Sequence, residues 1–373
     1  MAKKMEIFRR TGFDKPLALT CLILMSFGLI MVFSTSAVLS TDLFNRPFHF
    51  FFNQLIGALA GLLAVVILMN TPIPFYQNGL FIHGLLALTI LLLAVALLMP
   101  TIGNTNRWII LLGIRFQPSE LSKISLILYF AYFIDKKRER INEFRTLAPL
   151  LAVLGLVLFL IVKEPDYGTA LLVALIAALM LFIGGLRLTT CIALGTAAAA
   201  FVGVFLLQAS YARDRIATFI NPQNDPLASG FQAIQSKLAV GAGGVLGVSL
   251  GESTQKLFFL PCAHTDYIYA IIGEELGFIG ALGVLALFAL FLWRGMIVSR
   301  KAPDLFTRLA AAGLTFAICT QALLNISIVL GLVPSTGLPL PLFSFGRSSL
   351  VMTLIGIAIL LHISQRKAGQ RRS

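Results

Sequence analysis

The sequence is poor in charged residues and in cysteine, and each shortage excludes a class of protein. Asp, Glu, Lys and Arg make up only 12% of the 373 residues, whereas about 25% is usual in a soluble domain. The four cysteines show no metal-ligand spacing, and only Cys262 falls in a segment that we expect outside the membrane. One external thiol cannot form an internal disulfide framework. A soluble enzyme and a disulfide-stapled secreted domain are therefore excluded.

Signatures of several enzyme classes are also missing. There is no HExxH motif, no dinucleotide-binding βαβ unit and no Ser-His-Asp order in a soluble context. The glycine-rich stretch at residues 241–247, GAGGVLG, lacks the Lys-Ser/Thr and the preceding strand of a phosphate-binding loop. We find no internal repeat and no low-complexity tract. Hydrolysis by a triad, hydride transfer and nucleotide binding are unsupported.

Apolar residues are abundant instead, at 58% of the chain, and many apolar runs reach the roughly 20 residues that a bilayer requires. We predict an all-α membrane protein of about ten transmembrane helices that forms one domain over residues 1–373. The first run has no clear cleavage site and is interpreted as a retained span. The predicted spans are residues 16–39, 51–70, 79–99, 119–135, 147–162, 169–186, 188–208, 267–293, 307–331 and 347–363.

The basic residues predict the orientation of these spans. Lys and Arg cluster before the first span, in Lys136–Arg145, in Arg294–Arg308 and in Arg366–Arg372. These clusters fall on one side if the helices alternate across the membrane, and the positive-inside rule then places both termini in the cytoplasm. The net charge of +13 is therefore topological, with anionic lipid as a minor partner and no role in binding nucleic acid.

Two external segments depart from simple loops. Pro100–Pro118 is too apolar for a free loop and too interrupted for a span, so we expect it to re-enter the membrane or lie at its interface. The large loop at about residues 209–266 lies between the seventh and eighth spans. Its amphipathic middle, Phe231–Val240, predicts an ordered segment against the membrane.

Ionisable residues at membrane depth are functional candidates because burial of charge is costly. Here they gather at the predicted outer mouth of the bundle, where they could hold an anionic head group beside a proton acceptor. They are Arg107, Arg115, Glu120, Lys123, Glu164, Asp166, Lys256, His264, Asp266, Glu274 and Glu275.

Several of these residues also have a structural interpretation. Asp266 or Thr265 would make a good N-cap for the apolar helix that follows. Glu120 and Lys123, at i and i+3, share a helix face and can form a structural ion pair.

The following helix carries two adjacent carboxylates with different expected roles. Glu274 lies eight residues after Asp266 and is expected to line the same cavity two turns deeper, whereas Glu275 is expected to meet a neighbouring helix. The GxxxG pair Gly273 and Gly277 predicts close helix packing.

Five motifs in order resemble the SEDS family (shape, elongation, division and sporulation), which includes FtsW and RodA. The resemblance covers essentially the whole chain, and the segment at residues 255–277 is more similar to FtsW. The motifs are RWIILLGIRFQPSELSK (Arg107–Lys123), EPDYGTALL (Glu164–Leu172), FQAIQSKLAVGAGGVLG (Phe231–Gly247), QKLFFLPCAHTDYIYAIIGEELG (Gln255–Gly277) and GLPLPLFSFGRSSL (Gly337–Leu350).

The resemblance implies a peptidoglycan glycosyltransferase that polymerises lipid II during cell division and releases undecaprenyl diphosphate. It implies Asp266 as the catalytic carboxylate, with Arg107 and Lys123 lining the same cavity and Glu120 beside them. By position in the same outer mouth we add further predicted substrate-binding residues: Arg115, Gln117, Lys256, His264 and Glu274. The chain departs from the family pattern at Arg347, where glycine is usual, and at Cys262, where glutamate is usual.

The resemblance also implies partners and a location. The expected partners are lipid II, the nascent glycan strand, a class B penicillin-binding protein that acts as transpeptidase, and membrane proteins of the division complex. The expected location is the bacterial inner membrane, at the division septum, with the site facing the periplasm or cell exterior. A divalent cation, Mg²⁺ or Mn²⁺, shared by Asp266 and the diphosphate is compatible with this chemistry, although no ligand cluster in the sequence requires it.

Three alternative functions stay open at this point. A RodA-like polymerase of cell elongation would carry the same residues. A flippase for lipid II would use a similar cavity, but many transporters show paired broken helices at the midplane, which this sequence lacks. A non-catalytic scaffold for a partner enzyme would tolerate Asp266→Asn.

Overall fold

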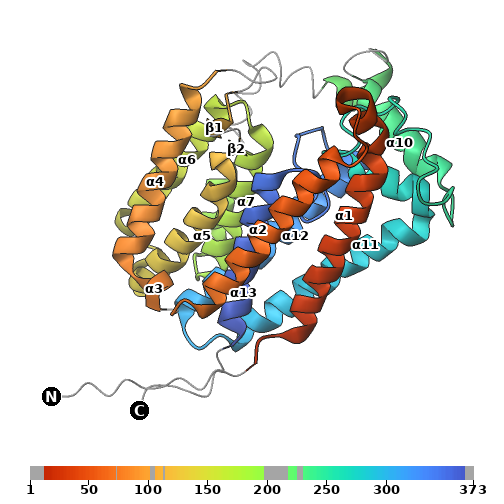
Figure 1. Ribbon diagram of the computed structural model, residues 1–373. Helices are drawn as coiled ribbons and strands as arrows, with labels where there is room; N and C mark the ends of the chain where they lie inside the picture. The colour runs from red at the N-terminus through yellow and green to blue at the C-terminus, as the bar shows by residue number, and fades with distance from the viewer. Residues whose placement is uncertain are drawn as a thin grey trace.

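The structure is a computed structural model that describes residues 12–72, 74–100, 106–111, 114–196, 217–224 and 230–365. It is a bundle of long helices with one small hairpin (Figure 1). The elements are α1 (Lys15–Phe44), α2 (His49–Asn70), α3 (Pro74–Gln77), α4 (Gly79–Leu97), β1 (Ile109–Leu111), β2 (Ile114–Phe116), α5 (Pro118–Lys137), η1 (Arg138–Arg140), α6 (Phe144–Lys163), α7 (Tyr167–Ile183), η2 (Pro222–Asn224), α10 (Phe231–Ala242), α11 (Ile268–Lys301), α12 (Leu305–Val329) and α13 (Arg347–Ser364).

The described helices confirm a multi-pass, helical membrane protein. Seven of them, α1, α2, α4, α6, α11, α12 and α13, are long and apolar enough to cross a bilayer, and α7 is a shorter apolar helix. Helix α5, with 20 residues, occupies the predicted span at 119–135 but carries more charge. The predicted span at 188–208 is helical over residues 188–196, and its remainder lies outside the described residues.

Local sequence explains where several helices begin. Asp14 accepts a hydrogen bond from the N–H of Leu17 at 2.9 Å and so caps α1. Asp304 caps α12 in the same way through the N–H of Thr307 at 2.8 Å. These caps satisfy N–H groups that have no partner within the helix.

Helix α12 is the centre of the bundle and packs against α5, α7, α11 and α13. In its most apolar stretch 72% of the residues are buried, compared with 22% in α2 and α6. The outer helices instead expose large apolar side chains, as expected of surfaces that face lipid. Polar groups on α12 consequently lie inside the protein.

The two ends of the described chain meet on one side of the bundle. The N–H of Asp14 donates to Ser364 Oγ at 3.0 Å, and Arg294 Nη2 of α11 pairs with Asp14 Oδ2 at 2.5 Å. The start of α1 therefore lies beside the end of α13, as an even number of membrane crossings requires. The cytoplasmic assignment of this side stays a prediction from the charge pattern.

The segment predicted to re-enter the membrane contains a β-hairpin in its described part. Strands β1 and β2 are antiparallel, with Ile110 opposite Arg115, and they lie at the end of the bundle that also carries α10 (Figure 1). Strand pairing satisfies backbone groups that a re-entrant loop would leave without partners in an apolar environment. Residues 101–105 and 112–113 lie outside the description.

Helix α11 is interrupted at Gly277, and this changes the interpretation of the GxxxG motif. Gly277 has φ 64° and ψ −164°, a conformation that is not helical. Across the interruption the glycine-rich stretch bonds to α11 through its backbone: Val248 N donates to Glu274 O at 3.0 Å, and Phe278 N donates to Gly244 O at 2.9 Å.

A Cβ on Gly277 would overlap the backbone of Gly247, whereas Gly273 packs against Val240 of α10. The GxxxG motif therefore serves contact between α11 and the preceding loop segment, rather than between two spans. Within that segment, α10 confirms the ordered helix that the amphipathic pattern at Phe231–Val240 predicted.

Candidate active site

Asp266 lies just before α11 and is partly exposed. The N-cap of α11 is Tyr267, which makes no side-chain capping bond, so the predicted N-cap role of Asp266 or Thr265 is wrong. Asp266 Oδ2 lies 3.7 Å from the position that a Cβ on Gly337 would occupy. The carboxylate therefore faces the start of residues 337–346, in the segment that joins α12 to α13.

Three consecutive carbonyls hold this part of the chain in place. The His264 carbonyl accepts a hydrogen bond from Phe345 N at 2.9 Å. The Thr265 carbonyl accepts one from Ser344 Oγ at 2.5 Å. The Asp266 carbonyl accepts one from Asn325 Nδ2 of α12 at 2.8 Å. The backbone that carries the Asp266 carboxylate is thereby tied to two later parts of the chain.

A second charged centre lies on α5. Lys123 Nζ is 2.8 Å from Glu120 Oε2, and both side chains are almost completely buried. This contact confirms the pairing predicted from their i, i+3 spacing. Lys123 Nζ also donates to Gln321 Oε1 of α12 at 2.7 Å. These three side chains line a cavity between α5, α12 and α13.

The start of α5 is joined to the start of α7 through Asp166. Its carboxylate accepts hydrogen bonds from Gln117 Nε2 at 2.9 Å and Ser119 Oγ at 3.1 Å. It also caps α7 through the N–H of Thr169 at 3.2 Å. The Nε2 group of Gln117, a predicted substrate-binding residue, thus donates a hydrogen bond within the protein.

Glu164, in the link between α6 and α7, is completely buried, and within the described part of the chain neither carboxylate oxygen has a hydrogen-bond partner. Burial, reinforced by the nearby Asp166 charge, raises the pKa of Glu164 to about 8, and Arg107 opposes that shift. Arg107 Nε is likewise buried without a hydrogen-bond partner. Most buried polar atoms in proteins have a hydrogen-bond partner, so Glu164 and Arg107 are candidates for contact with substrate. By contrast, Arg115 is exposed on β2.

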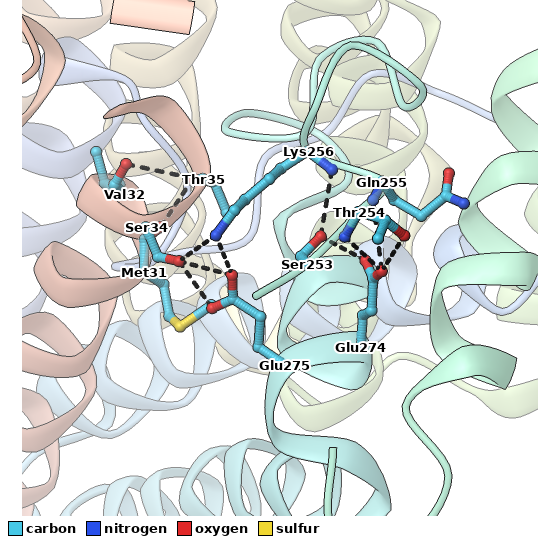
Figure 2. Close-up of polar contacts among 10 residues, drawn as sticks. All are labelled: Met31, Val32, Ser34, Thr35, Ser253, Thr254, Gln255, Lys256, Glu274 and Glu275. Carbon is cyan, nitrogen blue, oxygen red and sulfur yellow. Dashed lines mark hydrogen bonds and ion pairs between the residues drawn. The ribbon is translucent and has the colours of Figure 1, made fainter. Parts of the chain in front are cut away.

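Glu274 makes a structural contact within the protein. Its carboxylate accepts hydrogen bonds from Ser253 Oγ at 2.5 Å, from Thr254 N at 2.9 Å and from Thr254 Oγ1 at 3.0 Å (Figure 2). A carboxylate saturated by donors of its own chain holds the loop at residues 253–255 onto α11. The predicted contact of Glu274 with substrate stays a prediction beside this structural role.

Lys256 is also used within the protein. Its Nζ lies 2.7 Å from Glu275 Oε1, and Ser34 Oγ of α1 donates to the same carboxylate at 2.7 Å (Figure 2). The prediction that Glu275 meets a neighbouring helix is confirmed. The charge of Lys256 is compensated by this buried ion pair, and its predicted contact with substrate stays a prediction.

His264 packs among aromatic rings, with its ring centroid 5.0 Å from that of Phe50 and 5.8 Å from that of Phe345. Burial lowers the pKa of His264 to about 4, so this ring is uncharged at neutral pH. It can offer a hydrogen bond to a substrate but no positive charge.

The described residues do not form a metal site by themselves. No group of three or more His, Cys, Asp or Glu side chains comes together within the part of the chain that the structure describes. A cation bound through Asp266 would need most of its ligands from elsewhere, such as a diphosphate. A divalent cofactor therefore stays a prediction of the resemblance.

Sequence reasoning missed three amide side chains that the structure places beside the site: Gln54, Gln321 and Asn325. Gln54 of α2 donates to the Ser344 carbonyl at 3.0 Å and accepts from Gly346 N at 3.0 Å. The pattern that could have revealed them is the presence of carboxamides inside otherwise apolar spans, where each needs partners.

Taken together, the fold and these groups define a multi-pass membrane protein with several buried charged side chains, two of which, Glu120 and Lys123, line a cavity between helices. The family described as "Cell cycle protein", which comprises FtsW, RodA and SpoVE, matches residues 15–369. The chain belongs to this family.

Similar proteins cover nearly the full chain. The probable peptidoglycan glycosyltransferase FtsW of Trichlorobacter lovleyi is 41% identical, over 96% of this chain and 94% of that protein. FtsW of Geobacter metallireducens is 40% identical over 98% of both. Stage V sporulation protein E of Bacillus subtilis is 38% identical, over 96% of this chain and 98% of its own.

Two solved structures share the fold. A chain from a structure on the coordination of polymerization and crosslinking by a peptidoglycan synthase complex superposes with a TM-score of 0.79 at 28% identity, covering 94% of this chain and 97% of that chain. The rod shape determining protein RodA of Thermus thermophilus gives a TM-score of 0.72 at 24% identity, covering 96% and 98%. This second likeness supports the fold alone.

Proposed function

We propose that this chain is a peptidoglycan glycosyltransferase of cell division, which joins lipid II units into glycan strands. The observation that carries the proposal is the similarity of about 40% over almost the whole chain to proteins named probable peptidoglycan glycosyltransferase FtsW. The geometry supports it, because α12 bonds both to the main-chain carbonyl of Asp266, which carries the candidate carboxylate, and to the buried cation Lys123.

Asp266 acts as the general base in this proposal. Its carboxylate takes the proton from the 4-hydroxyl of the acceptor sugar, and the hydroxyl oxygen forms a bond to the anomeric carbon of the donor. The bond between that carbon and the diphosphate breaks, undecaprenyl diphosphate leaves, and the configuration inverts. A positioned base typically contributes about 10²–10⁴ in rate.

The cationic groups stabilise the leaving group. Negative charge grows on the diphosphate as the glycosidic bond breaks, and Lys123 and Arg107 can balance it in a site with little water. Buried Arg107 Nε has no hydrogen-bond partner among the residues that the structure describes, which leaves a donor for a phosphate oxygen. Glu120, 2.8 Å from Lys123 Nζ, orients the Lys123 side chain until the substrate arrives.

The same proposal includes a partner and a location. We place the chain in the bacterial inner membrane at the division septum, with Asp266 on the outer side, and pair it with a single-span class B transpeptidase that cross-links the new strands. The similarity to a chain from a peptidoglycan synthase complex supports a partner of this kind. The positive-inside rule supports the orientation.

The test is polymerisation of fluorescent lipid II by the purified protein with its cognate transpeptidase. Wild type is expected to make long glycan chains, and Asp266→Asn is expected to make none while still binding lipid II. Full activity of Asp266→Asn would contradict the catalytic assignment. Absence of chains from both proteins, in an intact complex that binds lipid II, would favour a flippase or a scaffold.

A further inference from the structure

Two carboxamide side chains on α12, Gln321 and Asn325, lie one helical turn apart and point to the same side. Both are almost completely buried, with exposed fractions of 2% and 1%. A buried amide in an apolar span is unfavourable unless its polar atoms have partners. Their contacts therefore show what this face of α12 is built to hold.

Asn325 holds the backbone of Asp266. Its Nδ2 donates one hydrogen to the Asp266 carbonyl at 2.8 Å and the other to the Leu338 carbonyl at 2.7 Å. Both amide hydrogens are thus used, and each bond crosses to a different part of the chain. Asparagine is suited to this position because it offers two donors on one short side chain.

Gln321 holds the charged centre on α5 in a corresponding way. Its Oε1 accepts from Lys123 Nζ at 2.7 Å, while its Nε2 donates to the Pro339 carbonyl at 2.8 Å. The two side-chain amides therefore donate hydrogen bonds to adjacent main-chain carbonyls, those of Leu338 and Pro339. The segment that contains these two residues also passes Asp266, whose Oδ2 lies near Gly337.

We propose that Gln321 and Asn325 are a pair of positioning residues that set the placement of Lys123 relative to Asp266, with the Leu338–Pro339 backbone as their common support. The inference rests on the proposed function, in which Asp266 takes the proton and Lys123 meets the diphosphate. Neither amide touches the reacting atoms. Asn325 positions Asp266, which activates the attacking hydroxyl. Gln321 positions Lys123, which stabilises the leaving diphosphate.

Because the two residues have different roles, their variants should affect kcat and lipid II binding differently, which a general loss of stability would not do. Asn325→Leu removes both donors at similar volume and is expected to lower kcat about 100-fold, as a displacement near 1 Å can do, while lipid II binding stays near that of wild type. Gln321→Leu removes a hydrogen bond to a charged group, and is expected to weaken lipid II binding about 10-fold with a smaller effect on kcat.

The experiment measures kcat, KM and lipid II binding in the complex with the transpeptidase, together with the thermal unfolding temperature. Thr315→Val is the matched control, because Thr315 is buried on the same helix and, among the described residues, its hydroxyl donates to the carbonyl of Ala311 alone, at 2.7 Å. We expect wild-type kinetics from it. If Asn325→Leu does not fold, Asn325→Ser serves, since one hydroxyl cannot bond to both carbonyls.

The outcomes separate this inference from the proposed function. Wild-type kcat in both Asn325 variants would overturn it, as would an equal loss of kcat, binding and stability in the Asn325 and Gln321 variants. A kcat effect from Asn325 and a binding effect from Gln321 would support it. Wild type and Asp266→Asn are run in the same assay, and failure of the proposed function would appear there as an inactive wild type or an active mutant.

Discussion

Lys256 Nζ lies 2.7 Å from Glu275 Oε1 in an ion pair whose side chains are 6% and 0% exposed. Ser34 Oγ of α1 donates to both oxygens of the same carboxylate, at 2.7 and 2.8 Å. The ion pair and its Ser34 contact thus connect the loop before Asp266 to α11, which follows it, and to α1, which is distant in sequence. Its burial makes the two charges depend strongly on each other.

We predict that Lys256→Met destabilises the protein by about 3–5 kcal/mol, because it leaves the Glu275 carboxylate buried without its cation. The double variant Lys256→Met with Glu275→Gln is expected to recover most of that loss. Thermal unfolding in detergent micelles measures both. If the single variant unfolds at the wild-type temperature, the ion pair is not a structural tie. A loss of lipid II binding in a fully stable double variant would support the prediction from the sequence that Lys256 contacts substrate.

The interruption of α11 makes a second prediction. Gly277 has a positive φ of 64°, and a Cβ there would overlap the backbone of Gly247. Gly277→Ala is expected to cost at least about 1–3 kcal/mol, as strained backbone conformations do. Gly283→Ala is the control on the same helix, because a Cβ there meets nothing within 4 Å; it should be neutral or stabilising by up to about 1 kcal/mol. Equal unfolding temperatures for the two variants would contradict the account.

The Glu120–Lys123 pair can be tested for structure and function separately. Lys123→Met should destabilise the protein, because Glu120 then lies buried without its partner. Adding Glu120→Gln should restore the unfolding temperature. If Lys123 meets the diphosphate, polymerisation stays at least about 10-fold below wild type in this double variant, since a bond to a charged group is still missing. Full recovery of glycan synthesis would leave the pair with a structural role only.

Glu164 makes the stability of the protein depend on pH. Burial first, and then the Asp166 charge, raise the pKa of Glu164 from the ordinary 4.5 to about 8. The folded protein therefore keeps this proton between pH 4.5 and about 8, where the unfolded chain has lost it. The contribution of Glu164 to the free energy of unfolding is therefore most favourable below pH 4.5 and falls as pH rises from 4.5 to about 8. Glu164→Gln should flatten the fall, as measured by unfolding temperature against pH. Parallel curves for the two proteins would contradict the assignment.

The sequence determined the membrane-spanning helices and part of the charged site. Spans are recognisable because the bilayer imposes a local condition on length and hydropathy, and α1, α2, α4, α6, α12 and α13 follow it. The Glu120–Lys123 contact follows from helix periodicity, which needs no information about the fold. The motifs in order also indicated the family to which the chain belongs.

Only the tertiary structure decided which polar groups meet. Asn325 and Asp266 are 59 positions apart, and Lys123 and Gln321 are 198 apart, so no local pattern could pair them. Glu274 and Glu275 are adjacent in the sequence, yet one holds a loop and the other reaches α1, because neighbouring residues on a helix point in different directions. Burial in an apolar bundle makes an unpaired polar group costly, and the packing of the helices around α12 determines which partners these groups have.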